Sequence, residues 1–318
     1  MLEICPLTII IREMMMAKQK VAENGKKIWA IGGGKGGIGK TFFTANLGVG
    51  LARMGKKVIV VDSDLGGINL HTLLGIKFVK YSLDDYIHNT CSLEEATLPT
   101  SIDNLWLLSG AGGILGSANP FYFQKMKIIH CFNKLEADYI LVDLGAGSSY
   151  NVLDFINSAD EKIIIFSPEP TSIQNAYGFL KSALYRKLIR TFKDNKPVQD
   201  IIKKAIDPKN KKKVSTLDEL SQRVGEVDKD GHIIFKETVD NYRPNTIINM
   251  LKNKGEQNIA LSLNLTAKKF LNLDMNYLGF VESDALVSES VKAMTPFMKM
   301  NPDAHVSTSI NKIIQRLV

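Results

Sequence analysis

The chain has 318 residues, of which 45% are hydrophobic and 23% are charged, and its formal net charge is +7. This composition is typical of a globular protein with a full core, and it excludes a disordered or low-complexity chain. No apolar run approaches the ~18 residues that span a bilayer. Three scattered cysteines argue against a disulfide framework or a structural zinc site. The positive charge would suit an anionic partner, although such a lysine surplus is more often solvated surface.

The N-terminal residues do not have the pattern of a targeting signal. Their apolar stretch, Leu7–Ile11, is too short for a signal-peptide core, and basic residues follow it instead of preceding it. The run Met14–Met16 offers alternative start sites. We therefore expect residues 1–25 to be an extension of a folded domain that occupies residues 26–318, in a cytoplasmic protein.

After this extension, short β-branched runs alternate with longer segments of helical periodicity. The predicted strands are Ile28–Gly33, Val58–Val61, Leu105–Leu108, Tyr139–Val142, Ile163–Phe166, Thr246–Asn249 and Tyr277–Val281. The predicted helices include Thr41–Met54, Pro120–Leu135, Ser172–Leu188, Asp284–Met294 and Ser307–Leu317. Continuous apolar strands are covered on both faces, and helix-sized connections between them indicate a doubly wound, mostly parallel α/β sheet. Ligands of such sheets bind at the carboxyl ends of the strands.

One polar segment interrupts this alternation. Residues 190–245 are rich in charged side chains, with a lysine cluster in Pro208–Lys213 and a turn signal at Asp228–Gly231. We interpret the segment as a helical lobe that is inserted between two strands. The lysine cluster is more typical of a solvated loop than of a nucleic-acid site.

A phosphate-binding motif lies between the first predicted strand and the first predicted helix. Residues 34–41 read GKGGIGKT and satisfy the pattern GxxxxGK[ST] in its required context. Glycines let successive N–H groups turn toward phosphate oxygens, and the helix dipole supports them. Lys40 would supply a cation to the β and γ phosphates, and the Thr41 hydroxyl can ligate Mg²⁺. The expected nucleotide contacts in this motif are Gly34, Lys35, Gly36, Gly37, Ile38, Gly39, Lys40, Thr41 and Phe42.

Acidic residues follow two of the predicted strands. Asp62 and Asp64 end the strand VIVV, and Asp143 follows the run YILV. Alternate residues of an extended chain face one side, so Asp62 and Asp64 can both meet the site. Two acids at a buried strand end usually share a cation or a reacting water, although helix capping by one of them is the alternative. Asp143 would help to neutralise Mg²⁺, and the turn Gly145–Gly147 can change conformation with the γ phosphate.

The phosphate loop, KGGIGKT, resembles the deviant Walker A loop of the MinD/ParA group, because it carries the additional lysine Lys35. The resemblance implies that two ATP molecules are sandwiched in a homodimer and that Lys35 reaches the phosphates bound by the partner subunit. It also implies that Asp62 holds a magnesium-bound water and that Asp64 orients the attacking water. The implied catalytic residues are Asp64, Lys35 and Lys40, the implied metal ligands are Thr41, Asp62 and Asp143, and the implied ligands are ATP and Mg²⁺.

The resemblance continues downstream, over roughly Lys26–Val318 apart from the polar segment. Ser167–Lys181 is similar to the dimer-facing turn and helix of the family, and Asn249 matches the adenine-binding asparagine. Glu282 and Asp284 fall on the second adenine loop. This loop reads Glu-Ser-Asp here, so the proline of the family pattern Pro-x-Asp is missing.

The sequence after Asp62, DLGGINLHTLLGI, is close to the MinD-like and FlhG/FleN-like branch and lacks the DxDPQGN pattern of the ParA partition ATPases. No cysteine pair suits the dimer axis of the iron–sulfur carriers in the same superfamily. The resemblance therefore implies an ATPase that controls the placement or number of a cell structure, with the flagellum as first choice and the division site as second. It implies a protein partner there. The alternatives are a DNA-partition ATPase and a nucleotide-binding scaffold without turnover.

The last predicted helix is amphipathic. Ile310, Ile313, Ile314 and Leu317 share one helical face. Such a face could hold the protein at the inner face of the membrane by docking on an anionic bilayer. The same pattern describes a final helix that packs on the sheet, and we favour that interpretation.

Overall fold

The structure is a computed structural model that describes residues 25–64, 69–110, 122–207, 214 and 216–318. The strands are β1 (Lys27–Gly32), β2 (Val58–Asp62), β3 (Thr97–Pro99), β4 (Leu105–Leu108), β5 (Tyr139–Asp143), β6 (Glu161–Phe166), β7 (Asn245–Leu251) and β8 (Asn276–Glu282). The helices that cover or extend the sheet are α2 (Lys40–Arg53), α6 (Tyr122–Lys134), α7 (Tyr150–Ser158), α8 (Pro170–Thr191), α12 (Lys254–Leu271) and α15 (His305–Leu317). The remaining helices are α3 (Leu70–Leu73), α4 (Leu83–Ile87), α5 (Leu93–Ala96), α9 (Lys196–Ile206), α10 (Leu217–Val227), α11 (Lys229–Asp240), α13 (Ala285–Lys292) and α14 (Phe297–Met300).

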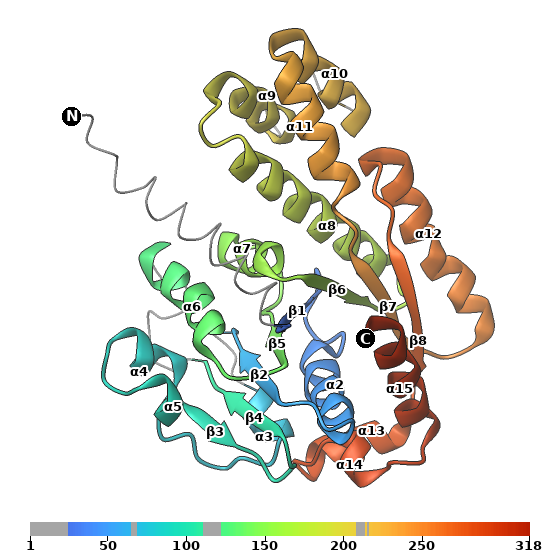
Figure 1. Cartoon of the computed structure of the whole chain (residues 1–318). Helices are drawn as coiled ribbons and strands as arrows, with labels where there is room; N and C mark the ends of the chain where they lie inside the picture. Colours follow the sequence, from blue (N-terminus) through green and yellow to red (C-terminus); the bar gives the residue numbers. More distant parts are fainter. Residues whose placement is uncertain (1–24, 65–68, 111–121, 208–213, 215) are drawn as a thin grey trace.

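The strands form one eight-stranded sheet in the order β3-β4-β2-β5-β1-β6-β7-β8 (Figure 1). Neighbouring strands are parallel except for β3, which pairs antiparallel with β4. The predicted α/β class is therefore confirmed, and each of the seven predicted strands is present. The edge strand β3 was not predicted, because it has three residues and ends in Pro99. A proline is tolerated only where no ladder hydrogen bond is needed, as at a sheet edge.

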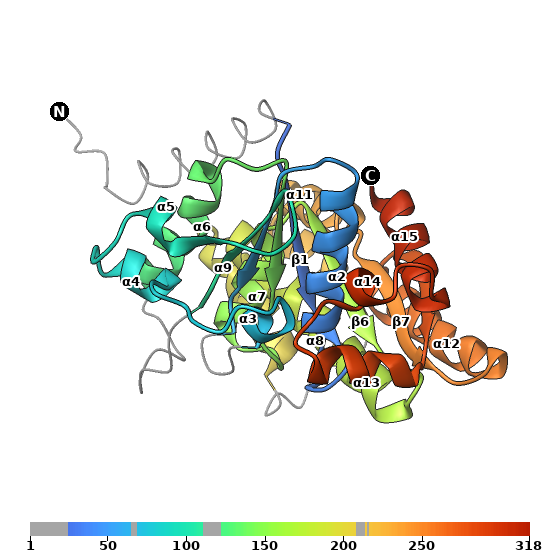
Figure 2. The ribbon, with the colours of Figure 1, turned by 90° about the horizontal axis from the view of Figure 1, so that it is seen from below.

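The two faces of the sheet are buried by different helices. In β1, Trp29 and Ile31 pack in the cluster that contains α2 and α15, whereas Ile28 and Ala30 pack in the cluster that contains α6, α7, α8 and α12. Figure 2 shows α2 and α15 on one side of β1 and α6 on the other. Because both faces are covered, every position of a central strand is apolar, which explains the continuous runs in the sequence.

Helix α15 packs in the core. Ile310, Ile313, Ile314 and Leu317 lie against α2 and β8, and the most exposed of them, Leu317, is 9% exposed. A Cβ atom at Gly50 of α2 would collide with Ile314, so this glycine allows the two helices to approach closely. The hypothesis that this apolar face docks on a membrane is therefore wrong, because the sheet and α2 already cover it. Within the described part of the chain, no helix is both long and apolar enough to cross a bilayer.

Helices α9, α10 and α11 lie between α8 and β7 in the sequence and extend the fold beyond the sheet at the top of Figure 1. They pack on one another and on α8 through buried apolar side chains such as Ile202, Leu220 and Phe235. The helical insertion is thus present, and the exact limits of the lobe stay a prediction. The lysine cluster Pro208–Lys213 lies outside the described residues, as do the first two residues of the predicted helix Pro120–Leu135.

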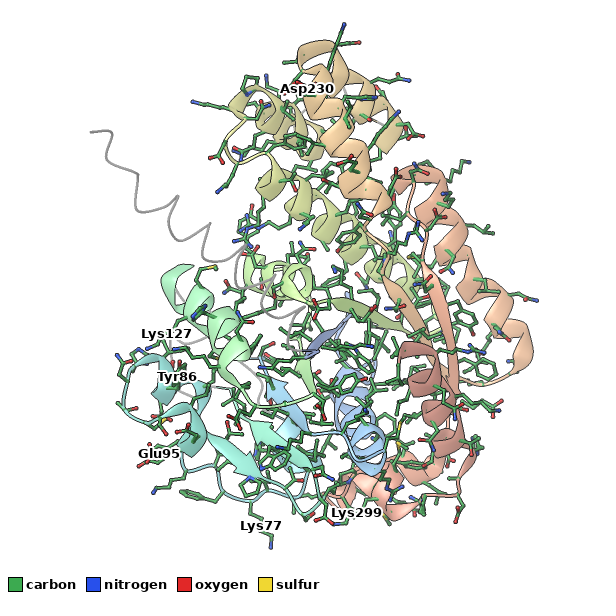
Figure 3. All side chains as sticks on the ribbon, viewed as in Figure 1. Lys77, Tyr86, Glu95, Lys127, Asp230 and Lys299 are labelled. Carbon is green, nitrogen blue, oxygen red and sulfur yellow. The ribbon has the colours of Figure 1, made fainter. Side chains whose placement is uncertain are left out.

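The segment between α3 and β4 forms a small helical corner. Both α4 and α5 begin with a reciprocal capping box, which Ser82 makes with Asp85 and Ser92 makes with Glu95. Lys127 of α6 holds this corner, because its ammonium group donates to the Ile87 carbonyl oxygen at 2.7 Å. The same ammonium group lies 5.2 Å from the centre of the Tyr86 ring (Figure 3).

Candidate functional site

The phosphate loop joins β1 to α2 and surrounds the N-terminus of that helix. Its glycines Gly37 and Gly39 have φ of 75° and 90°, a left-handed conformation that glycine adopts without strain. Gly39 is the N-cap of α2, and among the described residues no side chain caps this helix and no acid lies in its first turn. The first N–H groups of α2 are therefore available to an anion.

Three glycine positions of the loop region, Gly33, Gly34 and Gly39, are fixed by close contacts of the chain. A Cβ atom at Gly33 would lie 2.6 Å from the Ile165 carbonyl oxygen, and Cβ atoms at Gly34 and Gly39 would collide with the Asn175 carbonyl oxygen and the Asn249 amide. At Gly37, by contrast, an added Cβ atom would meet nothing within 4 Å among the described residues. The exposed tip of the loop is therefore the part that is free to face a second molecule.

The two lysines of the loop lie in different environments. Lys40 is 8% exposed, and its ammonium group donates to the Lys35 carbonyl oxygen at 3.2 Å. Burial lowers the pKa of Lys40, and the nearby carboxylates of Asp143 and Asp64 oppose this shift. The ammonium group of Lys35 is solvent-accessible and lies 3.3 Å from Oε2 of Glu169. Glu169 was not predicted, since no sequence pattern links it to the loop.

Asp62 ends β2 and is almost fully buried. Its carboxylate accepts hydrogen bonds from the main-chain N–H groups of Asp64 at 3.1 Å, Asn69 at 3.3 Å and Leu70 at 3.2 Å. Burial nevertheless raises the pKa of Asp62 to about 6, because the lost hydration outweighs these hydrogen bonds. A cation at this carboxylate would favour its charged form.

Asp143 lies beside Asp62, because the two residues end neighbouring strands in direct register. The Thr44 hydroxyl donates to its Oδ1 at 3.1 Å, and Thr41 also bonds its side chain. Burial, and then the charge of Asp62, raises the pKa of Asp143 to about 7. The sequence pattern missed Thr44, although its position one turn after Thr41 places both hydroxyls on one face of α2.

The chemistry of these residues fits a magnesium ion that is shared with a phosphate. Within the described residues, no three His, Cys, Asp or Glu side chains are grouped closely enough to hold a metal on their own. Mg²⁺ commonly uses one or two carboxylates together with substrate phosphates and water, instead of a complete protein cage. Asp62, Asp143 and the Thr41 hydroxyl provide that partial set beside the phosphate loop.

Asp64 lies against the turn that follows β5. A Cβ atom at Gly145 would be 3.2 Å from Oδ1 of Asp64, so the carboxylate packs closely on this glycine. The charge of Asp64 is also close enough to Lys40 to raise the pKa of that lysine. The structure therefore brings Asp64, Lys40 and the turn Gly145–Gly147 to one place. Residues 65–68, which follow Asp64, lie outside the described residues.

The residues predicted to contact the base make hydrogen bonds or ion pairs with other parts of the chain. The Asn249 amide is buried and donates to the Ile38 carbonyl oxygen at 2.9 Å, so Asn249 lies beside the phosphate loop. Asp284 caps α13 and accepts the Leu286 N–H at 2.8 Å. Both Asp284 and Glu282 pair with His305, each at 3.6 Å, which the sequence pattern did not predict.

Two residues of the motif that were predicted to contact the nucleotide, Ile38 and Phe42, have buried side chains. The side chains of Ile38 and Phe42 are 4% and 8% exposed and pack in the core. The ring of Phe42 meets those of Phe43 and Phe297 edge to face, at centroid distances of 5.9 Å and 6.0 Å. Only the main chain of Ile38 and Phe42 can therefore face a ligand.

The raised pKa values predict a pH dependence of stability for the ligand-free protein. We expect the free energy of unfolding to fall as the pH rises from about 4 to about 7. In this range the folded protein binds more protons than the unfolded chain, since Asp62 and Asp143 titrate above the usual value of 3.8. The stability that protonation provides is thus lost as the pH passes the folded-state pKa values.

Chemical denaturation at a series of pH values measures this effect. Asp143→Asn should flatten the profile, whereas Asp194→Asn, at an exposed carboxylate, should leave it unchanged. The assignment of raised pKa values to these two buried carboxylates would be contradicted by a different result. In that result, the free energy of unfolding of the parent rises between pH 4 and 7, and Asp143→Asn leaves the profile unchanged.

Known proteins resemble this chain over its N-terminal half and in its fold. The family described as ParA, NUBPL iron-transfer P-loop NTPase, matches residues 24–181. The antiactivator FleN of Pseudomonas aeruginosa is 32% identical over 166 residues, which are 52% of this chain and 59% of that protein. The septum site-determining protein MinD of Synechocystis is 35% identical over 152 residues, 47% of this chain and 56% of that protein. The matches therefore span little more than half of these relatives.

Solved structures show the same fold over nearly the whole chain. The septum site-determining protein MinD of Pyrococcus horikoshii, complexed with Mg-ADP, superposes with a TM-score of 0.61 at 23% identity, over 92% of this chain and 96% of that chain. A ParA family ATPase of Chlorobium tepidum gives a TM-score of 0.62 at 16% identity, over 92% of this chain and 99% of that chain. At such identities the likeness establishes the fold alone.

Proposed function

Since this chain belongs to the ParA/MinD family of P-loop NTPases, we propose that it is an ATPase that works as a dimerising molecular switch. The observation that carries the proposal is that groups suited to binding phosphate and magnesium meet at the N-terminus of α2. There the buried ammonium of Lys40 and the uncapped helix end lie beside the acids Asp62 and Asp143. This set supplies donors and a cation for phosphates, and acids for their magnesium ion.

The positions of the residues support a role for each. We propose that Lys40 and the N–H groups of the loop hold the phosphates of ATP, and that Asn249, whose amide donates to the Ile38 carbonyl oxygen beside the loop, contacts the base. Bound Mg²⁺ would neutralise phosphate charge and increase the electrophilicity of the γ phosphorus. We propose that Asp64, which lies against Gly145 and close to Lys40, accepts a hydrogen bond from the attacking water and orients it.

We propose that dimerisation uses the exposed edge of the phosphate loop. Lys35 pairs within its own chain with Glu169, and both side chains are accessible to solvent, so their ion pair is weak. In an ATP-bound dimer, Lys35 would exchange this partner for the phosphates that the second subunit holds. Contacts made only with ATP supply the differential free energy that a switch requires, and hydrolysis removes them.

A side chain at Gly37 tests this surface. We expect Gly37→Val to leave the binding of Mg-ADP by the monomer within about threefold and to prevent ATP-dependent dimerisation, since the new side chain projects from the loop tip. Valine at the left-handed φ of Gly37 adds about 2 kcal/mol of local strain. The matched control is Gly36→Ala, whose Cβ atom would make an ordinary contact of 3.9 Å with Ala146. Sedimentation velocity measures the dimer, and a Gly37→Val protein that dimerises like the parent would contradict the assignment.

For the cellular role, we propose control of flagellar placement or number, with division-site placement as the second choice. Support comes from the similarity to FleN, named an antiactivator, and to MinD, named a septum site-determining protein. The test is deletion of the gene, followed by counts of flagella per cell and of septum positions. A changed flagellar number with normal septa supports the first choice, and misplaced septa with normal flagella support the second. If both stay normal, the proposed role is wrong.

A further inference from the structure

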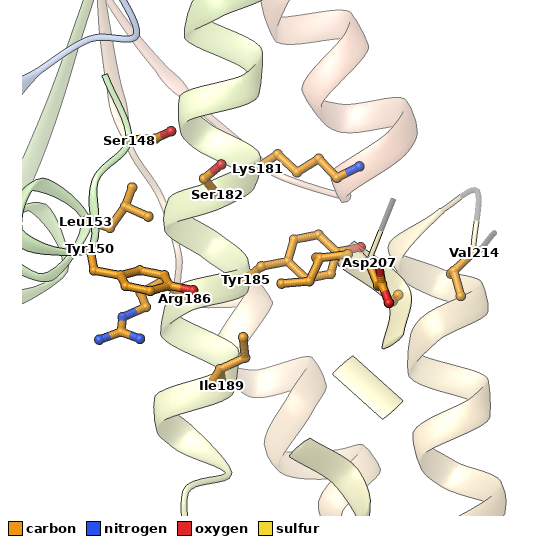
Figure 4. Close-up of a pocket in the computed structure, with 12 residues that line it drawn as sticks. Ser148, Tyr150, Leu153, Lys181, Ser182, Tyr185, Arg186, Ile189, Asp207 and Val214 are labelled. Atoms are coloured by element: carbon orange, nitrogen blue, oxygen red, sulfur yellow. The ribbon is translucent and has the colours of Figure 1, made fainter. Parts of the chain in front are cut away.

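A cavity lies outside the phosphate loop, between α7, α8 and the end of α9. Its volume is about 460 Å³, and it spans α8, with Tyr150 and Leu153 on one side and Tyr185 and Val214 on the other (Figure 4). Small-molecule sites usually have volumes of ~300–1,000 Å³, mostly apolar walls and a few placed polar groups. The apolar walls here are Leu153, Ile189, Ala205, Ile206 and Val214. The nucleotide site accounts for none of these residues.

Tyr185 supplies a polar group to which the described part of the chain offers no hydrogen-bond partner. Only 5% of this residue is exposed, and burial raises the pKa of Tyr185 to about 12, so it stays a neutral hydroxyl donor. Among the described residues, nothing forms a hydrogen bond with this hydroxyl, which lines the cavity. Because this hydroxyl opens into the cavity and has no acceptor among the described residues, it can donate a hydrogen bond to an acceptor on a ligand.

The charges around the cavity favour an anion. Lys181 contacts the Tyr185 ring, with 5.8 Å between its ammonium group and the ring centre, and within the described chain no carboxylate pairs with it. Arg186 also lines the cavity, and its guanidinium group shares the buried carboxylate of Asp154 with Arg190. One carboxylate, Asp207, lines the cavity as well, so the lining has two basic side chains and one acidic side chain.

We propose that this cavity binds a small organic acid that joins an apolar body to one carboxylate. The carboxylate would accept hydrogen bonds from the Lys181 ammonium and the Tyr185 hydroxyl, and the apolar body would cover Leu153, Ile189 and Val214. The volume suits one small molecule, whereas a stable protein interface needs ~20–30 residues on each side. The inference does not depend on the proposed nucleotide site, because none of these residues forms part of that site.

Isothermal titration of the full chain with decanoate, in saturating Mg-ADP, tests the proposal. The nucleotide fills the phosphate site, so the titration reports other sites. Decanoate should bind at one site, and decanol and decylammonium at least about tenfold more weakly, because they lack the negative charge. Lys181→Met should weaken decanoate binding about tenfold, and Tyr185→Phe about fivefold. The matched control is Lys187→Met, which removes the same charge from α8 but does not line the cavity.

Any one of three results would overturn the proposal. One is that the parent protein shows no saturable binding of decanoate at about 1 mM. This result does not depend on whether a variant folds. The second is equal affinity for decanoate, decanol and decylammonium, and the third is equal loss in Lys181→Met and Lys187→Met, since both would mean that no placed cation receives the carboxylate.

Discussion

Replacing Lys40 with methionine is expected to weaken the binding of Mg-ATP at least about a hundredfold, or roughly 2.7 kcal/mol. The loop encloses Lys40, which is 8% exposed as a residue. Its ammonium group donates a hydrogen bond to the Lys35 carbonyl oxygen. An enclosed cation makes charge-assisted hydrogen bonds to phosphate oxygens, which are about twice as strong as neutral ones. Methionine keeps most of the length of the side chain and removes the charge.

Calorimetric titration with Mg-ADP and with a non-hydrolysable Mg-ATP analogue measures the loss. Lys57→Met removes the same charge from an exposed position at the opposite end of α2, so it should bind like the parent. Thermal melting establishes that Lys40→Met still folds. A folded Lys40→Met protein with parental affinity would contradict the placement of the phosphates in this loop.

Replacing Asp64 with alanine is expected to lower the rate of ATP hydrolysis at least about a hundredfold, because a positioned general base or water-orienting group contributes ~10²–10⁴-fold. The affinity for Mg-ATP should stay within about threefold of the parent, since Lys40, Thr41 and Asp143 remain. The rate of phosphate release under saturating Mg-ATP measures the first effect, and titration measures the second.

Asp103→Ala removes an exposed carboxylate far from the loop and should hydrolyse ATP at the parental rate. Two outcomes separate the roles of Asp64. Hydrolysis by Asp64→Ala at the parental rate would show that the residue does not orient the water. Loss of nucleotide binding in the same variant would instead assign Asp64 to holding the nucleotide.

The strand positions and the phosphate loop could be predicted from the sequence because each depends on local chemistry. A strand that is covered on both faces must be apolar throughout, as in Tyr139–Val142, and an anion-binding loop needs glycines next to a helix end. The position of Asp62 beside Asp143 depends instead on β2 and β5 being neighbours, although far apart in sequence. Periodicity gives no strand order, so the raised pKa values of this pair follow only from the structure.

Other features were missed or left open because they depend on what packs against a segment. The apolar face of α15 has the same pattern whether it meets a bilayer or a protein core, and contact with Gly50 of α2 resolves the choice. Glu169 and Lys35 are far apart in sequence, as are His305 and Glu282. Each pair comes into contact only when the chain folds. The cavity beside Tyr185 likewise exists only because α9 and α7 lie on the two sides of α8.

Size-exclusion chromatography with light scattering, on the parent and on Asp64→Ala, tests the central claim most directly. The account predicts a monomer with Mg-ADP for both proteins. With Mg-ATP it predicts a dimer that decays in the parent as ATP is consumed and persists in Asp64→Ala. A monomer in every nucleotide state, for both proteins, would contradict the dimerising switch and leave only a nucleotide-binding P-loop protein.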